Sequence, residues 1–327
     1  MLYDNHGRSI SYLRLAVTDR CNLRCTYCMP AEGLNWMPRK EILSYEELVR
    51  ICTLLVNMGI KKIRITGGEP FVRKGMINFI EQLIGLERLE EVNITTNGVL
   101  TAPLVPALKK IGVHSLNLSL DTLDRKRFQA ITRRDELPAV LDTLETALQS
   151  GMPVKINAVV MDKKNTDDIL SLAALTKENA LSVRFIEEMP FNGASNGLKG
   201  ISWDYRRILA RIREHYPGLQ KMADPHASTS LNFQVPGHKG TIGVIPAYTR
   251  SFCGSCNRIR LTPEGELKTC LYGKGVVNLK DKIREGLPDE LLKTALMKAF
   301  QSRTKDGWEA ERQQGNVLHP SMAKIGG

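Results

Sequence analysis

Six short apolar segments with the pattern of β-strands alternate, along the first 190 residues, with longer segments that have helical spacing. The strand-like segments are 10–18, 61–66, 90–96, 115–121, 154–161 and 181–187. Helical patterns fill intervals between them, at 45–58, 75–86 and 137–149. Because parallel strands need a crossover connection, this order predicts βαβ units around a parallel sheet, an α/β fold. Functional residues are then expected at the carboxyl ends of the strands.

The helix predicted over 45–58 has clear start and stop signals. Ser44 and Glu47 form an S-x-x-E capping box, and Gly59 follows the last helical residue. Apolar residues recur at positions i, i+3, i+4 and i+7, which are Leu48, Ile51, Cys52 and Leu55. Cys52 is therefore interpreted as a core residue.

The alternation of strands and helices fades after residue 190. Residues 190–201 are rich in Gly and Asn and are interpreted as a linker. Beyond them the patterns predict a helix over 203–215, loops and short strands over 217–250 and a last helix over 288–301. We therefore expect a barrel-like unit over 1–200 and a smaller C-terminal domain over 201–327.

Composition excludes several classes of protein. The net charge is +11, mostly from the second half, which suits an anionic partner, but aromatic residues make up only 6% and the basic residues are scattered. A nucleic-acid partner is therefore not expected. No apolar run approaches the roughly 18 residues of a membrane span, and the start has no signal-peptide pattern. A soluble, cytoplasmic protein without a membrane partner is the prediction.

Six of the seven cysteines fall into two groups of three. The first comprises Cys21, Cys25 and Cys28, directly after the first predicted strand; the second comprises Cys253, Cys256 and Cys270. Such clusters without an export signal form a poor disulfide framework and a good metal-site pattern. Three thiolates on a short loop suit a 4Fe-4S cluster with one open iron. Zinc or redox thiols are the alternatives, but they need a fourth ligand or a paired partner.

Two motifs in this first region resemble the radical S-adenosylmethionine (SAM) superfamily. They are TDRCNLRCTYCMP at 18–30 and GGEP at 67–70. The resemblance implies a partial (β/α)6 barrel of the TIM type, in which Cys21, Cys25 and Cys28 hold a 4Fe-4S cluster that binds SAM. It also implies that Tyr27 lies near the adenine and that Gly68 meets the methionyl amino group. Without the cysteine loop, GGEP would indicate only a turn.

The second cysteine group surrounds a segment, NRIRLT, with the pattern of a strand. Arg258 and Arg260 are two residues apart and therefore point to one face, where guanidiniums could bind phosphate or a purine edge. A solvated strand face is the simpler interpretation of the pair. A zinc ribbon is the alternative for the cysteines, with His238 or His319 as a fourth ligand.

Motifs along nearly the whole chain resemble the family of GTP 3′,8-cyclases of molybdenum cofactor biosynthesis. Besides the two cysteine regions they include ITTNG, NLSLD, KIN, EEMP and the terminal Gly326 and Gly327. The resemblance implies a second 4Fe-4S cluster on Cys253, Cys256 and Cys270, whose open iron meets the guanine. It implies that Ser119 and Met189 complete the SAM site. It further implies that GTP is bound by Arg14, Arg64, Thr95, Lys155, Arg258 and Arg260.

The family's reaction begins with a 5′-deoxyadenosyl radical derived from SAM, which removes the ribose 3′ hydrogen of GTP. The C3′ radical adds to C8, and reduction with protonation gives (8S)-3′,8-cyclo-7,8-dihydroguanosine 5′-triphosphate. The resemblance implies a lyase that needs an electron donor and passes its product to a cyclic pyranopterin monophosphate synthase; a homodimer is one assembly that it allows. Arg258, Arg260, Gly326 and Gly327 would act in catalysis, with the two glycines entering the active site.

Three other interpretations remain at this point. The terminal glycines could simply be a frayed end. A radical SAM peptide-modifying enzyme with an auxiliary cluster would also carry cysteines near its C-terminus, but it leaves Arg258 and Arg260 without a role. A zinc-bearing nucleic-acid-binding module would explain the basic charge.

Overall fold

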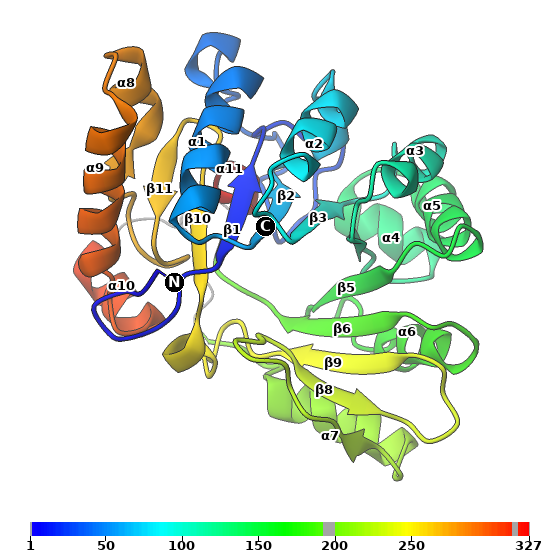
Figure 1. The fold of residues 1–327 in the computed structure, drawn as a ribbon. Helices are drawn as coiled ribbons and strands as arrows, with labels where there is room; N and C mark the ends of the chain where they lie inside the picture. The colour runs from blue at the N-terminus through cyan, green and yellow to red at the C-terminus, as the bar shows by residue number, and fades with distance from the viewer. Residues whose placement is uncertain (1, 192–199, 316–319, 327) are drawn as a thin grey trace.

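The computed structural model describes residues 2–191, 200–315 and 320–326. These residues form a curved sheet of twelve strands with helices on its outer side (Figure 1). The parallel strands are β1 (Tyr12–Ala16), β2 (Lys62–Thr66), β3 (Glu91–Thr96), β4 (Ser115–Ser119), β5 (Val154–Val160), β6 (Ser182–Glu187), β9 (Thr241–Ile245) and β10 (Arg258–Leu261). Antiparallel strands at the two edges are β7 (Gln220–Lys221), β8 (Leu231–Gln234), β11 (Glu266–Lys268) and β12 (Val277–Asn278). The sheet order is β12-β11-β10-β1-β2-β3-β4-β5-β6-β9-β8-β7.

Helices follow most of the parallel strands. Those of the first part are α1 (Tyr45–Met58), α2 (Met76–Ile84), α3 (Val105–Lys110), α4 (Arg125–Thr132), α5 (Leu137–Gln149) and α6 (Asp168–Glu178). Those of the second part are α7 (Tyr205–His215), α8 (Leu279–Arg284), α9 (Asp289–Gln301), α10 (Gly307–Gln314) and α11 (Met322–Ile325). Short 3₁₀ turns occur at Arg39–Glu41, Pro70–Val72, Ala102–Leu104 and Cys253–Ser255. No helix in the described ranges is long and apolar enough to cross a membrane.

All six strands predicted from the sequence are present, and so is the parallel arrangement. The partial barrel of the TIM type is confirmed, but two further parallel strands join it from the second half of the chain. β9 pairs with β6, and β10 pairs with β1. The sequence pattern did not place β10 in this sheet because its pairing partner lies about 245 residues earlier in the chain, beyond the reach of any local signal.

The ends of α1 match the sequence signals. The Ser44 hydroxyl accepts a hydrogen bond from the Glu47 amide at 3.2 Å, and the Glu47 carboxylate accepts one from the Ser44 amide at 2.7 Å. The helix ends at Gly59, whose φ of 124° suits glycine. Cys52 is fully buried on the face that packs against the sheet, so its interpretation as a core residue is confirmed.

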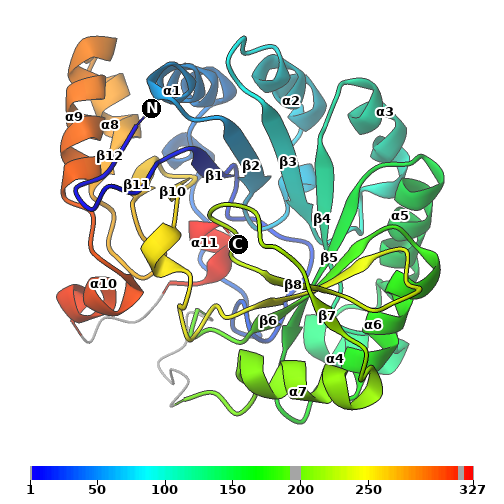
Figure 2. The ribbon, with the colours of Figure 1, turned by 60° about the horizontal axis from the view of Figure 1, so that its bottom comes forward.

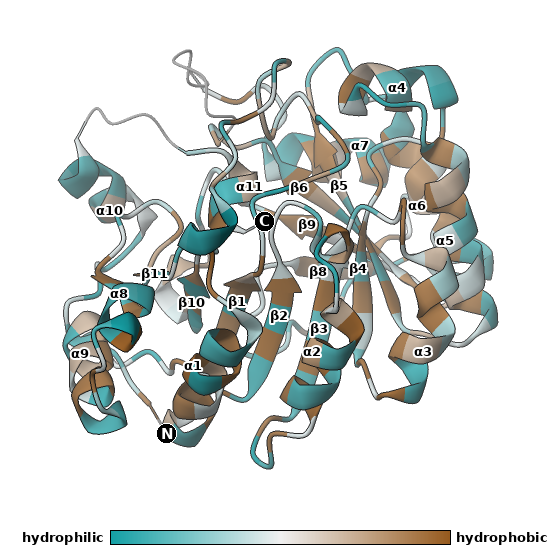
Figure 3. Cartoon of the chain, turned by 90° about the horizontal axis from the view of Figure 1, so that it is seen from above, coloured by the Kyte–Doolittle hydropathy of each residue, from teal (hydrophilic) through white to brown (hydrophobic). Residues whose placement is uncertain are grey.

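The two faces of the sheet differ in character because successive side chains of a strand point to opposite sides. On β1, Leu13 and Leu15 are fully buried in the main hydrophobic core, which also contains residues of the outer helices. Tyr12 and Arg14 alternate with them and line the concave side. The outer helices carry both hydrophilic and hydrophobic residues, as helices that cover a sheet do (Figure 3). The concave side therefore presents polar side chains, while the apolar side chains pack against the outer helices.

The C-terminal segment does not form a separate layer. β10 to β12 extend one edge of the sheet, while β7 to β9 extend the other. α11 lies inside the curve of the strands (Figure 2). The linker predicted at 190–201 falls largely on residues 192–199, which lie outside the described residues. The division at residue 200 therefore stays a prediction.

Candidate active site

A cavity of about 640 Å³ opens on the concave side of the sheet. Every site residue predicted within the barrel and the second cysteine region lines it. These residues are Arg14, Cys21, Cys25, Tyr27, Cys28, Arg64, Gly68, Thr95, Ser119, Lys155, Met189, Cys253, Cys256, Arg258, Arg260 and Cys270. Residues far apart in the sequence thus share one chamber, although their individual roles stay predictions.

The first cysteine group lies on the loop after β1, which packs against the GGEP segment after β2. The Gly68 amide donates to the Thr18 carbonyl at 2.8 Å. A Cβ atom at Gly68 would lie 2.2 Å from the Arg20 carbonyl oxygen, and one at Gly67 would lie 2.5 Å from that of Thr18. Glycine is therefore required at both positions to let the two loops meet.

The surroundings of the first group are apolar and acidic. Burial raises the pKa of Cys21 to about 12 and also raises the pKa of Cys25 and Cys28. The negative charges of Glu69, beside Cys21, and Asp121, beside Cys25, add to this effect. A thiol in such a place ionises when a metal replaces its proton. The donor set therefore fits a metal centre better than reactive free thiols.

Two of these carboxyl groups hold the site together. Asp121 accepts a hydrogen bond from the Tyr27 hydroxyl at 3.0 Å and one from the Val159 amide at 2.8 Å. Glu69 accepts from the amides of Phe71 and Asn97. Burial raises the pKa of Asp121 to about 6 and that of Glu69 to about 7. Asp121 thus fixes Tyr27, the residue predicted to lie near the adenine.

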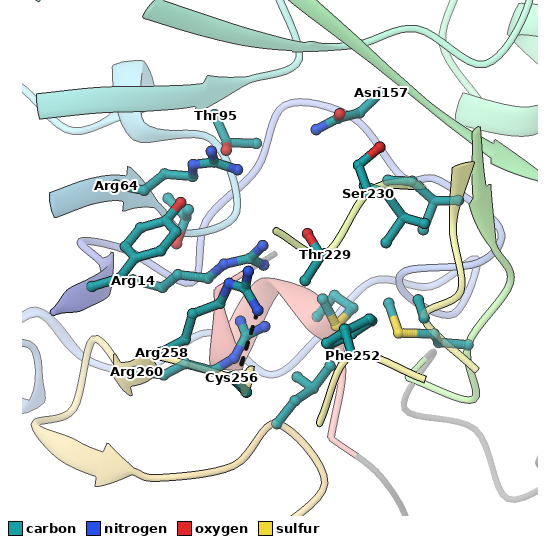
Figure 4. A pocket seen from close by; sticks show the side chains of 18 of the residues that line it. Arg14, Arg64, Thr95, Asn157, Thr229, Ser230, Phe252, Cys256, Arg258 and Arg260 are labelled. Atoms are coloured by element: carbon teal, nitrogen blue, oxygen red, sulfur yellow. Dashed lines mark hydrogen bonds between the residues drawn. The ribbon is translucent and has the colours of Figure 1, made fainter. Parts of the chain in front are cut away.

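The second cysteine group has cationic neighbours. The Cys256 sulfur accepts hydrogen bonds from Arg303 at 3.3 Å and from Arg258 at 3.7 Å, the latter drawn in Figure 4. Burial alone would raise the pKa of Cys256, but these two guanidiniums outweigh it and lower the pKa. Burial raises the pKa of Cys253 and Cys270. The second group therefore contains one thiol whose ionised form is stabilised by neighbouring guanidiniums.

Neither group resembles a zinc site. Sulfurs around one zinc lie within about 4 Å of each other, given a Zn–S distance of about 2.3 Å. In the described ranges no three His, Cys, Asp or Glu side chains converge on a point that would hold one ion. His238 bonds to the Thr176 hydroxyl instead, at 2.8 Å, and His319 lies outside the described residues. Two sets of three thiols that have no fourth protein ligand among the described residues fit 4Fe-4S clusters.

A wall of guanidinium groups faces the cysteines. Arg14 on β1 is in register with Arg64 on β2 and with Arg260 on β10, so the three side chains point to the same face. Figure 4 shows Arg14, Arg258 and Arg260 directed into the cavity from neighbouring strands. Burial lowers the pKa of Arg14 to about 10 and also lowers that of Arg64 and Arg260. Clustered cations that are buried away from water are costly unless they are paired with an anion, so this wall is suited to bind an anionic ligand.

Several atoms of this wall have no protein partner. Among the described residues, the buried Nε atoms of Arg14, Arg64 and Arg258 donate no hydrogen bond. Buried polar groups are normally satisfied, so unpaired ones that line a cavity indicate where a ligand's oxygen atoms fit. A triphosphate supplies several such oxygens.

Sequence reasoning missed several residues of the cavity, of which Arg184 is the clearest. Arg184 lies on β6 in register with Asn157 on β5, and both line the cavity. Burial lowers the pKa of Arg184, and its unpaired Nε is also buried. The sequence did contain a signal for this site residue, because Arg184 is a charged residue within a mostly apolar strand segment, LSVRFIE. The alternation that identified Arg258 and Arg260 would have found it.

The C-terminal segment bridges the two cysteine regions. The Ser321 hydroxyl donates to the Cys28 carbonyl at 2.6 Å, and the Gly326 carbonyl accepts a hydrogen bond from Arg260. Gly326 has a φ of 78°, and a Cβ atom there would lie 2.5 Å from the Thr66 hydroxyl. Ile325 is buried, which does not fit a frayed end. Gly327 lies outside the described residues.

Comparison with known proteins identifies two family models in the chain. The radical SAM superfamily model matches residues 15–176, and the Molybdenum Cofactor Synthesis C model matches residues 181–308. A crystal structure of SuiB from Streptococcus suis bound to S-adenosylmethionine has a TM-score of 0.61 at 16% identity, and it covers 81% of this chain and 61% of that one. That likeness confirms the fold.

Relatives in several organisms align with most of the chain. The GTP 3′,8-cyclase of Desulforamulus reducens is 40% identical over 97% of this chain and 99% of its own length. The mitochondrial GTP 3′,8-cyclase of Arabidopsis thaliana is 41% identical over 100% of this chain and 84% of its own. The chain spans about half the length of the mouse molybdenum cofactor biosynthesis protein 1, which is 42% identical over 89% of this chain and 46% of its own. The chain therefore belongs to the GTP 3′,8-cyclase family of the radical SAM superfamily.

Proposed function

We propose that this protein converts GTP to (8S)-3′,8-cyclo-7,8-dihydroguanosine 5′-triphosphate in the biosynthesis of the molybdenum cofactor. The observation that carries the proposal is that two sets of three cysteines line the same cavity as a group of buried guanidiniums, several of whose Nε atoms have no hydrogen-bond partner among the described residues. Membership of the GTP 3′,8-cyclase family supports the same substrate and product.

In this proposal Cys21, Cys25 and Cys28 hold the cluster that binds SAM. When bound, that cluster and SAM supply a 5′-deoxyadenosyl radical. Tyr27, oriented by Asp121, lies near the adenine, and the backbone at Gly68 meets the methionyl amino group. Ser119 and Met189 complete the SAM site. The acidic surroundings of this group complement the positive charge of the sulfonium.

The opposite wall holds GTP. Arg14, Arg64, Arg258, Arg260, Lys155 and Thr95 bind the triphosphate and orient the nucleoside, and Cys253, Cys256 and Cys270 hold the auxiliary cluster that meets the guanine. The ring closure is intramolecular, and holding C3′ and C8 of the nucleotide close together lowers its entropic cost. With GTP and SAM bound, the filled cavity would exclude solvent that quenches a carbon radical.

The reaction balances when an external electron donor supplies two electrons. One electron would be used in the cleavage of SAM to methionine and the radical, and the radical would leave as 5′-deoxyadenosine with the 3′ hydrogen of GTP. C3′ then bonds to C8, and the second electron with one proton completes the dihydropurine. Gly326, whose carbonyl accepts a hydrogen bond from Arg260, helps to hold that side chain in place during this step. The catalytic role of Gly327 stays a prediction.

Four further predictions belong to this proposal. The units over 1–200 and 201–327 carry the SAM cluster and the auxiliary cluster, respectively. The product passes to a cyclic pyranopterin monophosphate synthase. The protein works in the cytoplasm, although the Arabidopsis relative is named mitochondrial. A homodimer is one assembly in which it could act.

The test is an anaerobic single-turnover assay on reconstituted protein. We expect about eight iron and eight sulfide per chain, as two 4Fe-4S clusters require. With GTP deuterated at C3′, one deuterium should appear in 5′-deoxyadenosine, whereas GTP deuterated at C2′ should transfer none. A colourless protein with one zinc, or transfer from C2′, would contradict the proposal.

A further inference from the structure

Arg303 lies just after α9 and directs its side chain at the second cysteine group. It is only 4% exposed. One Nη atom donates to the Cys256 sulfur at 3.3 Å and to the Arg258 carbonyl at 2.9 Å, while Nε donates to the Thr269 carbonyl at 3.0 Å. These acceptors lie on the segments that carry Cys256 and Cys270. The guanidinium is therefore fixed toward one cysteine sulfur.

A buried turn near the N-terminus holds Arg303 from the other side. Asp4 accepts a hydrogen bond from the remaining Nη atom of Arg303 at 3.2 Å and one from Arg8 Nε at 2.7 Å. Burial opposes ionisation of Asp4, but the hydrogen bonds from Arg8 and from the His6 amide outweigh it and lower its pKa. Asp4 therefore provides a counter-ion that orients Arg303.

The first cysteine group has no comparable partner among the described residues. The Cys21 sulfur accepts from the Leu23 amide at 3.4 Å and from the Asn97 side-chain amide at 3.6 Å, both neutral donors. Hydrogen bonds from charged donors are about twice as strong as neutral ones. The two groups therefore differ in the charge of the donors that contact their sulfurs.

We propose that Arg303, held by Asp4, is a positioning residue that raises the reduction potential of the auxiliary cluster through its hydrogen bond to Cys256. Reduction adds negative charge to a cluster and its thiolates, so a cationic donor at a ligating sulfur stabilises the reduced form most. The inference rests on the proposed function, because it requires the auxiliary cluster to be present.

The test uses a Cys21→Ser, Cys25→Ser, Cys28→Ser protein, in which only the auxiliary group remains. Its midpoint potential is measured by dithionite titration followed by electron paramagnetic resonance, with and without Arg303→Met. We expect the equilibrium constant for one-electron reduction to fall about tenfold or more, which is about 59 mV. An unchanged potential in Arg303→Met would overturn the inference.

Arg8→Met provides the matched control. Arg8 is also buried and also bonds to Asp4, but no hydrogen bond joins its guanidinium to a described cysteine sulfur; it donates instead to the Cys253 carbonyl at 3.2 Å. Its loss should change the equilibrium constant by about threefold at most. An equal shift in both variants would mean that the turn as a whole, and not the bond to sulfur, sets the potential, which also overturns the inference.

Cluster content separates the two hypotheses. If the protein with only the auxiliary cysteines binds no iron while Arg303 is intact, the proposed function is wrong and the inference falls with it. If Arg303→Met alone fails to retain about four iron, Arg303→Gln replaces it, because glutamine keeps an uncharged donor. The reduction potential of Arg303→Gln must also be lower than that of the parent. An unchanged potential in this variant would overturn the inference.

Discussion

The two cysteine groups have the same number of thiols but opposite electrostatic surroundings. Glu69 and Asp121 lie beside the first group, whereas Arg258 and Arg303 contact a sulfur of the second. A positively charged sulfonium suits the first site, and a polyanionic nucleotide suits the second. The comparison teaches that two sites with the same ligands can differ through the charges of their neighbouring residues, and this difference supports the proposed placement of SAM and GTP.

The largest effect should come from removing one cysteine of each group. We expect Cys25→Ser to abolish SAM cleavage, because the radical arises at the first group. Cys256→Ser should retain uncoupled cleavage without cyclised product. Chromatography of 5′-deoxyadenosine and product from anaerobic reactions measures both. Cleavage at the parent rate in Cys25→Ser would reverse the assignment of the two sites.

The second prediction concerns Gly326, which lies between the two regions. In Gly326→Ala the added methyl group would overlap Thr66 and Ala16, whose nearest atoms would be 2.5 and 2.8 Å away. Overpacking of this kind costs about 1–3 kcal/mol. Product formation should therefore fall about 5- to 150-fold, while iron content and SAM binding stay near the parent values. Single-turnover product yield measures it.

Gly286→Ala is the control for Gly326→Ala. Gly286 has a φ of 81°, but a Cβ atom there would have no neighbour within 4 Å. It therefore carries the same backbone strain without the clash. Equal losses of product in the two variants would show that the tail has no specific role at the cavity.

The third prediction concerns the cationic wall. Arg258→Ala and Arg260→Ala should each weaken GTP binding by about 1.5–3 kcal/mol, the range for hydrogen bonds to charged groups. This corresponds to a Kd increase of about 10- to 150-fold, measured by equilibrium binding to reconstituted protein. Arg125→Ala, which removes a surface arginine paired with Asp135, is the control. Parent affinity in both wall variants would place the nucleotide elsewhere.

The smallest predicted effect is a dependence of GTP binding on pH. Burial, together with the charges of Arg184, Lys62 and Arg64, lowers the pKa of Lys155 to about 8. Lys155 therefore loses its proton as the pH rises through 8, and the Kd for GTP should increase about tenfold between pH 7 and pH 9. Isothermal titration across this range measures it.

Lys155→Met sharpens the pH test. Without the amine, the rise in Kd between pH 7 and pH 9 should disappear.

The contribution of Lys155 to the stability of the parent protein should change in the opposite direction, becoming less unfavourable as the pH rises. The folded-state pKa lies below the ordinary 10.5, so the cost of burying the charged amine is largest below pH 8 and falls as the pH rises toward 10.5. A parent-like pH profile in Lys155→Met would assign the dependence to another group.

Much of the fold and the chemistry could be predicted from local patterns. The capping box before α1, the short apolar runs of β1 to β6 and the cysteine spacing are all properties of short segments. The chain's family membership was likewise visible in its motifs. Local patterns suffice wherever residues close in sequence act together.

The partners of the second group could not be predicted in this way. Asp4, Cys256 and Arg303 meet only through tertiary packing. No spacing rule relates residues so far apart, and an isolated Asp or Arg carries no signal of its own. The same reason explains why β10 was expected as a strand but not as the neighbour of β1.

The pairing of β10 with β1 also has a consequence for the order of folding. Tyr12 and Arg258 are register partners, so this pair closes a loop of about 245 residues. Contacts of such long range form slowly, because the entropy of closure is lost before the contact is gained. β1 to β6 pair in succession along the chain, so the loop after β1 can mature first. The two cysteine groups are then expected to become neighbours last, so that cluster insertion at the second site waits for closure of the sheet.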